Sequence, residues 1–279
     1  MFLFCSYPDD MQYSLSLTSF NRLAAVHQCL IEAFGTPPEH LRLDPVSQMV
    51  LAIISALTRD EASGPAFLRL AQHCGRWEML ARMSPDEIEP VLHGVTHPED
   101  KADTLPRAIR EIIARRGRLT LDFLADWPVG AAIDWLEKLY GVGPKTSAAT
   151  LNLSTLQRRA LVVDRAHCRA ARCLGLVPGK ADLGQTVRRL DHLLPDEWDA
   201  ADMTRHYALM KRLGKTFCVQ ASPCSCPFSP VCASSAQSVP WMMRGKCLED
   251  WLRARACRKD NDPPIASRPG QDIASCGLS

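Results

Sequence analysis

The sequence predicts an all-α fold, and three observations lead to that prediction. Apolar residues recur at intervals of three and four along most of the chain, which is the pattern of a helix with one buried face. Alternating valine, isoleucine and aromatic residues of the strand type are scarce. Glycine, proline and capping residues divide the chain into roughly ten helical segments with short connections.

Local signals bound the first helices. An apolar face that ends at Phe34 is followed by Gly35, which predicts a helix end there. Asp44 and Pro45 are typical of an N-cap followed by the first helical position. The segment that they begin runs to Leu57 and is apolar nearly all round, so we expect it in a core.

The same reasoning places the later helices. Ser84, Pro85 and Glu87 form a capping box with proline at the first position, and the helix it begins continues through Leu92. Further helices are predicted over 101–115, 120–127, 131–139, 144–153, 165–174, 182–194 and 197–213. Residues 258–279 hold few large apolar side chains and are predicted to be a disordered tail.

Composition restricts the possible classes of protein. The chain has 279 residues, 46% of them apolar and 23% charged, which is typical of a globular protein with two domains or two lobes. A net charge of +2 is too close to zero to indicate a nucleic acid or a membrane by itself. The apolar uncharged run 46–57 is well short of the roughly 20 residues that span a bilayer. With no secretory signal at the N-terminus, we expect a cytoplasmic protein that does not bind membranes.

A glycine turn is the first segment that indicates chemistry. The run from Leu139 to Thr146 reads Leu-Tyr-Gly-Val-Gly-Pro-Lys-Thr, with a predicted helix on each side. Gly141 and Gly143 allow a tight turn whose free amides could bind a phosphate oxygen, while Val142 packs between the two helices. A plain helix–turn–helix joint is the alternative interpretation.

Lys145 follows this turn at the start of a predicted helix. The positive end of the helix dipole and partial burial would both disfavour its ammonium form. A neutral lysine is a nucleophile that forms a Schiff base with a sugar carbon. The alternative is a surface lysine that only neutralises a phosphate.

Asp164 ends the short apolar run 161–163 and directly precedes a predicted helix. An N-cap is one role for this carboxylate. Facing a cleft, it could also act as a base or stabilise a cation, and the two roles are compatible. His167 is interpreted as a helix histidine whose hydrogen bonds are satisfied.

Four cysteines are crowded into fifteen residues after the last predicted helix. In a reducing compartment such clustering indicates a metal site, and four thiolates can hold a [4Fe–4S] cluster or a tetrahedral zinc ion. The four are Cys218, Cys224, Cys226 and Cys232. Cys29, Cys74, Cys168 and Cys173 lie on helical faces and are expected to be buried.

The order of these features resembles the endonuclease III family, DNA glycosylases of the helix-hairpin-helix superfamily. The resemblance covers roughly residues 20–235 and rests on the glycine turn with Lys145, the Val-Val-Asp run ending at Asp164, and the cysteine cluster. It implies a two-lobed helical fold. A six-helix barrel lobe would span 44–157, and 16–43 plus 158–235 would form a second lobe that carries an iron–sulfur cluster.

The resemblance also implies an activity and its residues. The protein would remove a damaged base, expected to be an oxidised pyrimidine, and then cleave the strand at the abasic site. Lys145 matches the family's nucleophilic lysine and Asp164 its aspartate. Double-stranded DNA with a damaged base or abasic site would be the partner of a monomeric enzyme. Contacts to the DNA are expected from Leu57, Leu139, Gly141, Val142, Gly143, Thr146, Arg165 and Arg169.

The sequence departs from the family at several positions. The first two gaps between the clustered cysteines are each one residue short, so zinc or no metal remain alternatives to the [4Fe–4S] cluster. The family has a glutamine near the end of the apolar helix around Ser55, which fills the space left by a flipped base, and here the nearby positions are Ala56 and Leu57. Leu57 could wedge between bases instead, and a site without a wedge is the alternative. A DNA-structure-binding protein without catalysis and a monofunctional glycosylase therefore remain alternatives.

Overall fold

The computed structural model describes residues 21–39, 41–219 and 226–228, together with 248, 250–253 and 255. Helices dominate these residues, and none of them lies in a β-strand. The predicted all-α class is therefore correct for the described part of the chain. The predicted tail, 258–279, lies outside it.

Ten α-helices and three short 3-10 helices are described. They are α1 (Arg22–Phe34), α2 (Pro45–Ile54), α3 (Asp60–Cys74), η1 (Trp77–Arg82), α4 (Pro85–Ile88), η2 (Glu89–Leu92), α5 (Pro98–Arg116), η3 (Asp122–Ala125), α6 (Val129–Glu137), α7 (Pro144–Asn152), α8 (Arg165–Cys173), α9 (Leu183–Asp191) and α10 (Ala200–Thr216). No helix in this part of the chain is long and apolar enough to cross a bilayer.

The predicted caps explain several boundaries. The Asp44 carboxylate accepts the amides of Val46 and Ser47 at 3.0 Å each and begins α2. Ser84 begins α4 with a capping box, and Gly35 ends α1 with a positive φ of 75°. These local hydrogen bonds are specified by neighbouring residues, so the sequence alone was sufficient to predict them.

Three predictions about the helices need correction. The helix from Asp44 does not reach Leu57 but ends at Ile54, because Ser55 is its C-cap and Leu57 adopts a left-handed backbone with φ of 59°. The helix predicted over 120–127 is only the short η3. The 15-residue helix α3 was not predicted at all.

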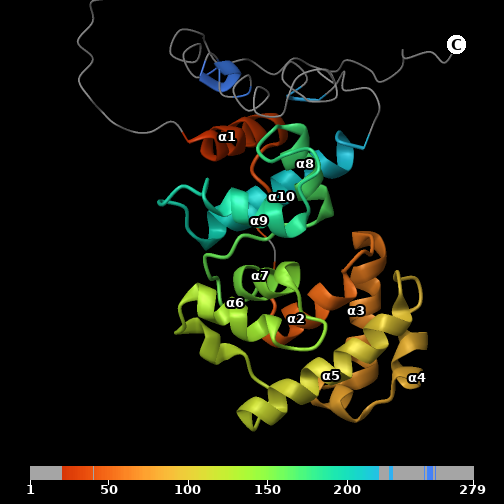
Figure 1. Ribbon diagram of the computed structural model, residues 1–279. Helices are drawn as coiled ribbons and strands as arrows, with labels where there is room; N and C mark the ends of the chain where they lie inside the picture. The colour runs from red at the N-terminus through yellow and green to blue at the C-terminus, as the bar shows by residue number, and fades with distance from the viewer. Residues whose placement is uncertain are drawn as a thin grey trace, which may run out of the picture.

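The helices surround two hydrophobic cores. The first core is built from buried side chains between Val46 and Val162, and the second from α1 together with buried side chains between Leu161 and Leu252. In Figure 1, α1, α8, α9 and α10 form one group, and α2 to α7 form the other. The connection between α7 and α8 runs from one group to the other and ends at Asp164, one of the residues predicted to be functional.

Candidate active site

The hairpin between α6 and α7 is a tight turn pressed against α5. Gly141 has a φ of 70°, and a side chain there would collide with Thr104. Gly143 has a φ of −111°, and a Cβ at this position would meet nothing within 4 Å. Of the two glycines, only Gly141 is therefore required by backbone conformation and space.

Hydrogen bonds inside the hairpin leave two amides unused. Val142 donates its amide to the Leu139 carbonyl at 3.1 Å, and the Gly143 carbonyl accepts the amides of Thr146 and Ser147. Among the described residues, no hydrogen bond uses the amide of Gly141 or Gly143. These amides are the donors that could bind a phosphate oxygen.

Three of the residues predicted to contact DNA lie at the hairpin, and their side chains are buried. Leu139, Val142 and Thr146 are all buried, and Val142 packs in the first core as predicted. Their side chains hold the turn in shape. Only their backbone, together with that of the glycines, is placed to contact a DNA strand.

Tyr140 and α5 support the outer side of the hairpin. The Tyr140 hydroxyl donates to Asp103 at 3.1 Å, and Arg107 pairs with the same carboxylate at 2.9 Å. The Arg107 guanidinium also lies 4.5 Å from the centre of the Tyr140 ring. Tyr140 remains 43% exposed, so a positive charge and an aromatic ring lie at the surface beside the turn.

Lys145 lies at the second position of α7, where that helix packs on the end of α2. Its Nζ donates to the Ser55 hydroxyl at 2.6 Å and to the Ala52 carbonyl at 3.2 Å. Burial lowers the pKa of Lys145 to about 8, and the positive charge of Lys211 contributes to the same shift. The sequence predicted this direction and burial as one of its causes, whereas the contribution of Lys211 was not predicted.

Asp164 is the N-cap of α8, as predicted, and each of its oxygens has a donor. Oδ1 accepts the His167 amide at 2.8 Å, and Oδ2 accepts the Tyr207 hydroxyl at 3.2 Å. The negative charge of Asp164 raises the pKa of Lys145 against the effect of burial. The amine and the carboxylate therefore face a common region, although they come from different groups of helices.

Asp60, the first residue of α3, connects this region to α10. Its carboxylate pairs with Lys211 at 2.8 Å and with Lys215 at 2.6 Å. Burial works to raise the pKa of Asp60, but hydrogen bonds from the two lysines and their charges outweigh it and hold the pKa below its usual value. These two ion pairs join the start of α3 to α10.

Leu57 lies on the exposed loop between α2 and α3. Its side chain is 52% exposed, two residues beyond the Ser55 hydroxyl that contacts Lys145. The loop is tied to the segment before α5, because the Thr58 hydroxyl accepts the Thr96 amide at 3.1 Å. Leu57 is therefore an exposed apolar side chain, and its role as a wedge stays a prediction.

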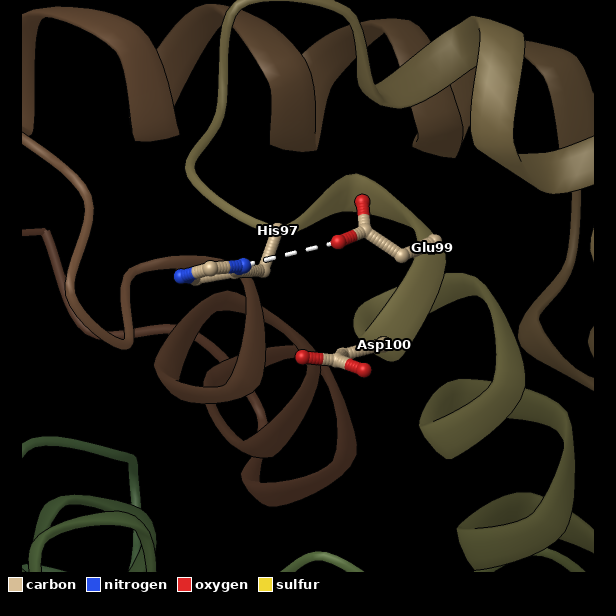
Figure 2. A group of neighbouring side chains, drawn as sticks. All are labelled: His97, Glu99 and Asp100. Atoms are coloured by element: carbon tan, nitrogen blue, oxygen red, sulfur yellow. Dashed lines mark ion pairs between the residues drawn. The ribbon is translucent and has the colours of Figure 1, made fainter.

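A small group of polar side chains lies at the start of α5, directly after Thr96. Figure 2 shows His97, Glu99 and Asp100, with the imidazole of His97 paired to Glu99 at 3.4 Å. One ligand atom from each lies within 4.8 Å of the others, and all three residues are exposed. Groups of exposed acidic residues like this one are common on protein surfaces without a bound ion.

Arg165 and Arg169, which were predicted to contact DNA, and the nearby Arg158 and Arg159 have different surroundings. Arg169 donates to the Gly214 carbonyl at 3.2 Å and joins α8 to α10, whereas Arg165 is exposed at the start of α8. Arg158 and Arg159 donate to backbone carbonyls of neighbouring loops. Of these four, Arg165 is the one whose position favours contact with a DNA backbone.

The predicted metal site lies only partly within the described residues. Cys218 follows α10 and packs, partly buried, against the second core, and Cys226 is buried in that core, while Cys224 and Cys232 lie outside the described residues. Thiols are the type of donor that such a metal site takes. Cys29, Cys74 and Cys168 are buried as predicted, and Cys173 is half-buried.

His167 is buried but is not the satisfied histidine that was predicted. Within the described part of the chain, neither of its ring nitrogens has a hydrogen-bond partner, and its ring packs edge-on to His206 at 5.4 Å. His206 also contacts His27 and Trp198 at ring distances of 5.5 and 5.0 Å. The cluster combines three helices and the loop before α10, so no local sequence pattern reveals it.

Tyr207 is the site residue that the sequence analysis missed. Together with Lys211 and Lys215 it forms a stripe on α10 at intervals of four residues, beside the face that is buried in the second core. That spacing is visible in the sequence and indicates one helix face. Ser55 was included in a predicted segment, but its contact with Lys145 was not foreseen.

Comparison with known proteins first defines the fold. The chain superposes on endonuclease III in a trapped covalent intermediate with DNA, with a TM-score of 0.62, 19% identity, and coverage of 77% of this chain and 97% of that structure. At this identity the match establishes the fold alone. The described helices therefore adopt the all-helical fold of endonuclease III structures.

Sequence comparison then gives the family. No protein-family model matches the chain. It is 29% identical over 149 residues to a protein of Arabidopsis thaliana named as a DNA glycosylase, which covers 53% of this chain and about half (50%) of that protein. It is 25% identical over 188 residues to endonuclease III of Thermotoga maritima, which covers 67% of this chain and 81% of that protein. The chain is therefore similar, at 25–29% identity, to endonuclease III-like DNA glycosylases, and it spans about half the length of the first of these relatives.

Proposed function

We propose that the chain is a DNA glycosylase with abasic-site lyase activity in base excision repair. The proposal rests on one observation: the Lys145 amine, whose pKa is lowered, lies within the electrostatic influence of the Asp164 carboxylate, which two hydrogen bonds hold in place. Burial brings the pKa of Lys145 to about 8, and the charge of Asp164 acts on that amine from the start of α8. An amine of this kind is suited to attack a sugar carbon.

The reaction begins with the loss of the base. A target nucleotide would be flipped out of the duplex at a cost of a few kcal/mol, which is smallest for a damaged pair. Positive charge then develops on the sugar ring as the bond to the base breaks and its electron pair leaves with the base. The Asp164 carboxylate, held by donors on both oxygens, opposes this charge.

Strand cleavage follows from the attack of Lys145. The neutral amine forms a bond to the C1′ carbon, and opening of the sugar ring leaves a protonated imine. The imine withdraws electrons, so the 2′ proton is lost and the bond to the 3′ phosphate breaks with its electron pair. Ser55 and the Ala52 carbonyl orient the amine before attack.

The hairpin and the surface loops would hold the DNA. The free amides of Gly141 and Gly143, with the exposed Arg165, suit contacts to phosphate oxygens that carry no sequence preference. Leu57 suits the role of an apolar wedge at the position of the extruded base. An oxidised pyrimidine is the substrate class we propose.

Cys218, Cys224, Cys226 and Cys232 would hold a [4Fe–4S] cluster. Four thiolates are the donor set that such a cluster takes, and Cys218 and Cys226 belong to the second core. The cluster would supply folding energy to the segment after α10 rather than chemistry at the sugar. Iron and zinc contents of the purified protein, with its visible absorbance, separate a cluster from zinc or no metal.

Borohydride trapping on DNA with a single abasic site tests the activity. The imine between Lys145 and the sugar should be reduced to a stable covalent adduct that Lys145→Ala abolishes and Lys138→Ala, a change at a nearby exposed lysine, leaves intact. An adduct that survives Lys145→Ala would contradict the assignment. Release of a base without an adduct would instead favour a monofunctional glycosylase, and binding without either would favour a DNA-structure-binding protein.

A further inference from the structure

We infer that Tyr207 is a positioning residue of the active site, which fixes the orientation of the Asp164 carboxylate through the hydrogen bond from its phenol. The inference rests on the proposed function, because it assigns Tyr207 a part in that reaction. It concerns a residue of α10 that lies 43 positions from Asp164 in the sequence.

The two hydrogen bonds to Asp164 have different consequences. A helix cap needs only one carboxylate oxygen, and Oδ1 serves as that cap through the His167 amide at 2.8 Å. The second bond, from the Tyr207 hydroxyl to Oδ2 at 3.2 Å, adds nothing to the cap. It does prevent the carboxylate group from rotating about its own axis, so both oxygens keep a fixed direction.

Tyr207 is held in place by packing with both hydrophobic cores. Its ring packs against the first core, while the buried face of α10 belongs to the second core. The Lys211 ammonium lies 5.6 Å from the centre of the ring and pairs with Asp60 of α3. The phenol therefore sets the Asp164 carboxylate in a position defined by α3 and the first core.

The phenol also has one fixed chemical role. Burial raises the pKa of Tyr207 well above its usual value, and the negative charge of Asp164 raises it further. The hydroxyl thus stays protonated and acts as a donor toward the carboxylate. As a fixed donor it holds the carboxylate oxygen in the direction from which Asp164 would oppose positive charge on the sugar.

Three ionisable groups of the described residues face the Asp164 carboxylate. They are Lys145 of α7, His167 of α8 and Tyr207 of α10, and each interacts electrostatically with Asp164. Lys145 is the proposed nucleophile, and His167 is held neutral by burial. Removal of the Tyr207 hydroxyl therefore changes one donor and leaves the other neighbours in place.

Tyr207→Phe tests the inference, with Tyr140→Phe as the matched control. The control removes the same hydroxyl from an exposed tyrosine that donates to Asp103 rather than to Asp164. Single-turnover base excision and trapping are measured from pH 5 to 9 on the full chain. Thermal unfolding of both variants sets an assay temperature at which both are folded.

We expect Tyr207→Phe to bind the duplex with unchanged Kd and to react about tenfold or more slowly. Tyr140→Phe should react at the wild-type rate. A rate of Tyr207→Phe within twofold of wild type at every pH would overturn the inference.

A double-mutant comparison separates a positioning role from loose packing. In an Asp164→Asn background, Tyr207→Phe should change the trapping rate by less than about twofold, since its effect passes through the carboxylate. Equal effects in both backgrounds would contradict the inference even if the single variant is less stable. If the wild-type protein shows no excision and no adduct, the proposed function itself fails.

Discussion

The pH dependence of imine formation is the sharpest consequence of the environment of Lys145. An exposed lysine has a pKa of 10.5, whereas burial and Lys211 lower that of Lys145 to about 8. Since one pKa unit is a tenfold change in the protonation equilibrium, the neutral fraction at pH 7 is about 300 times larger for Lys145. About a tenth of the amine is then neutral at pH 7.

The initial rate of trapping on a preformed abasic site, measured from pH 6 to 10, reports this pKa. The rate should rise about tenfold per pH unit at low pH and level off above about pH 8, because nearly all of the amine is then neutral. A rate that continues to rise tenfold per unit up to pH 10 would refute the assignment of Lys145 as a buried, activated nucleophile.

Lys211→Met identifies the cause of the shift, with Lys215→Met as its control. Both lysines pair with Asp60, so each substitution frees the same carboxylate. Of these two lysines, Lys211 is the one whose charge lowers the pKa of Lys145. We expect Lys211→Met to move the bend of the trapping profile to higher pH more than Lys215→Met does. Equal profiles for the two variants would show that the neighbouring charge has no part in the shift.

Three further predictions concern stability and DNA binding. Burial lowers the pKa of His167 to about 4, so the unfolded chain binds more protons than the folded chain between pH 6.5 and 4. The free energy of unfolding, measured with urea, should therefore fall by up to about 3 kcal/mol on acidification across this range. The decrease should be smaller in His167→Leu. Gly214→Ala would place a methyl group against the Ala166 carbonyl, and the same assay at pH 7 should show a loss of about 3 kcal/mol; a loss below about 1 kcal/mol would contradict this packing. Gly141→Ala should weaken binding to abasic DNA about tenfold or more, while Gly143→Ala, which has the space and backbone for a side chain, should not.

The sequence predicted the parts of the fold that depend on neighbouring residues. Capping by Asp44 and Ser84 and the end of α1 at Gly35 involve contacts within a few positions, and all three were predicted. Helix α3 was missed because Gly64 and Pro65, a pair typical of turns, lie inside it. Tertiary packing in the first core stabilises α3 in spite of this local preference.

The candidate site also has features that local sequence predicts and features that only the fold creates. Lys145 and Asp164 were found because each belongs to a short motif with a chemical meaning. The contacts of Ser55 with Lys145 and of Tyr207 with Asp164 join residues 90 and 43 positions apart, and no local pattern specifies them. The three clustered histidines also escaped prediction, since their cluster exists only when α1, α8 and α10 pack together.

Helix α10 links the two halves of the proposed chemistry. In the proposed reaction Tyr207 would orient the carboxylate that opposes charge on the sugar. One turn further along, the charge of Lys211 lowers the pKa of the amine that would attack the sugar. The close contact of Gly214 with Ala166 fixes α10 against α8, which begins directly after Asp164. A small shift of α10 would therefore disturb the carboxylate and the amine together. It follows that substitutions at this contact, remote from any bound DNA, should impair base excision and imine formation in parallel.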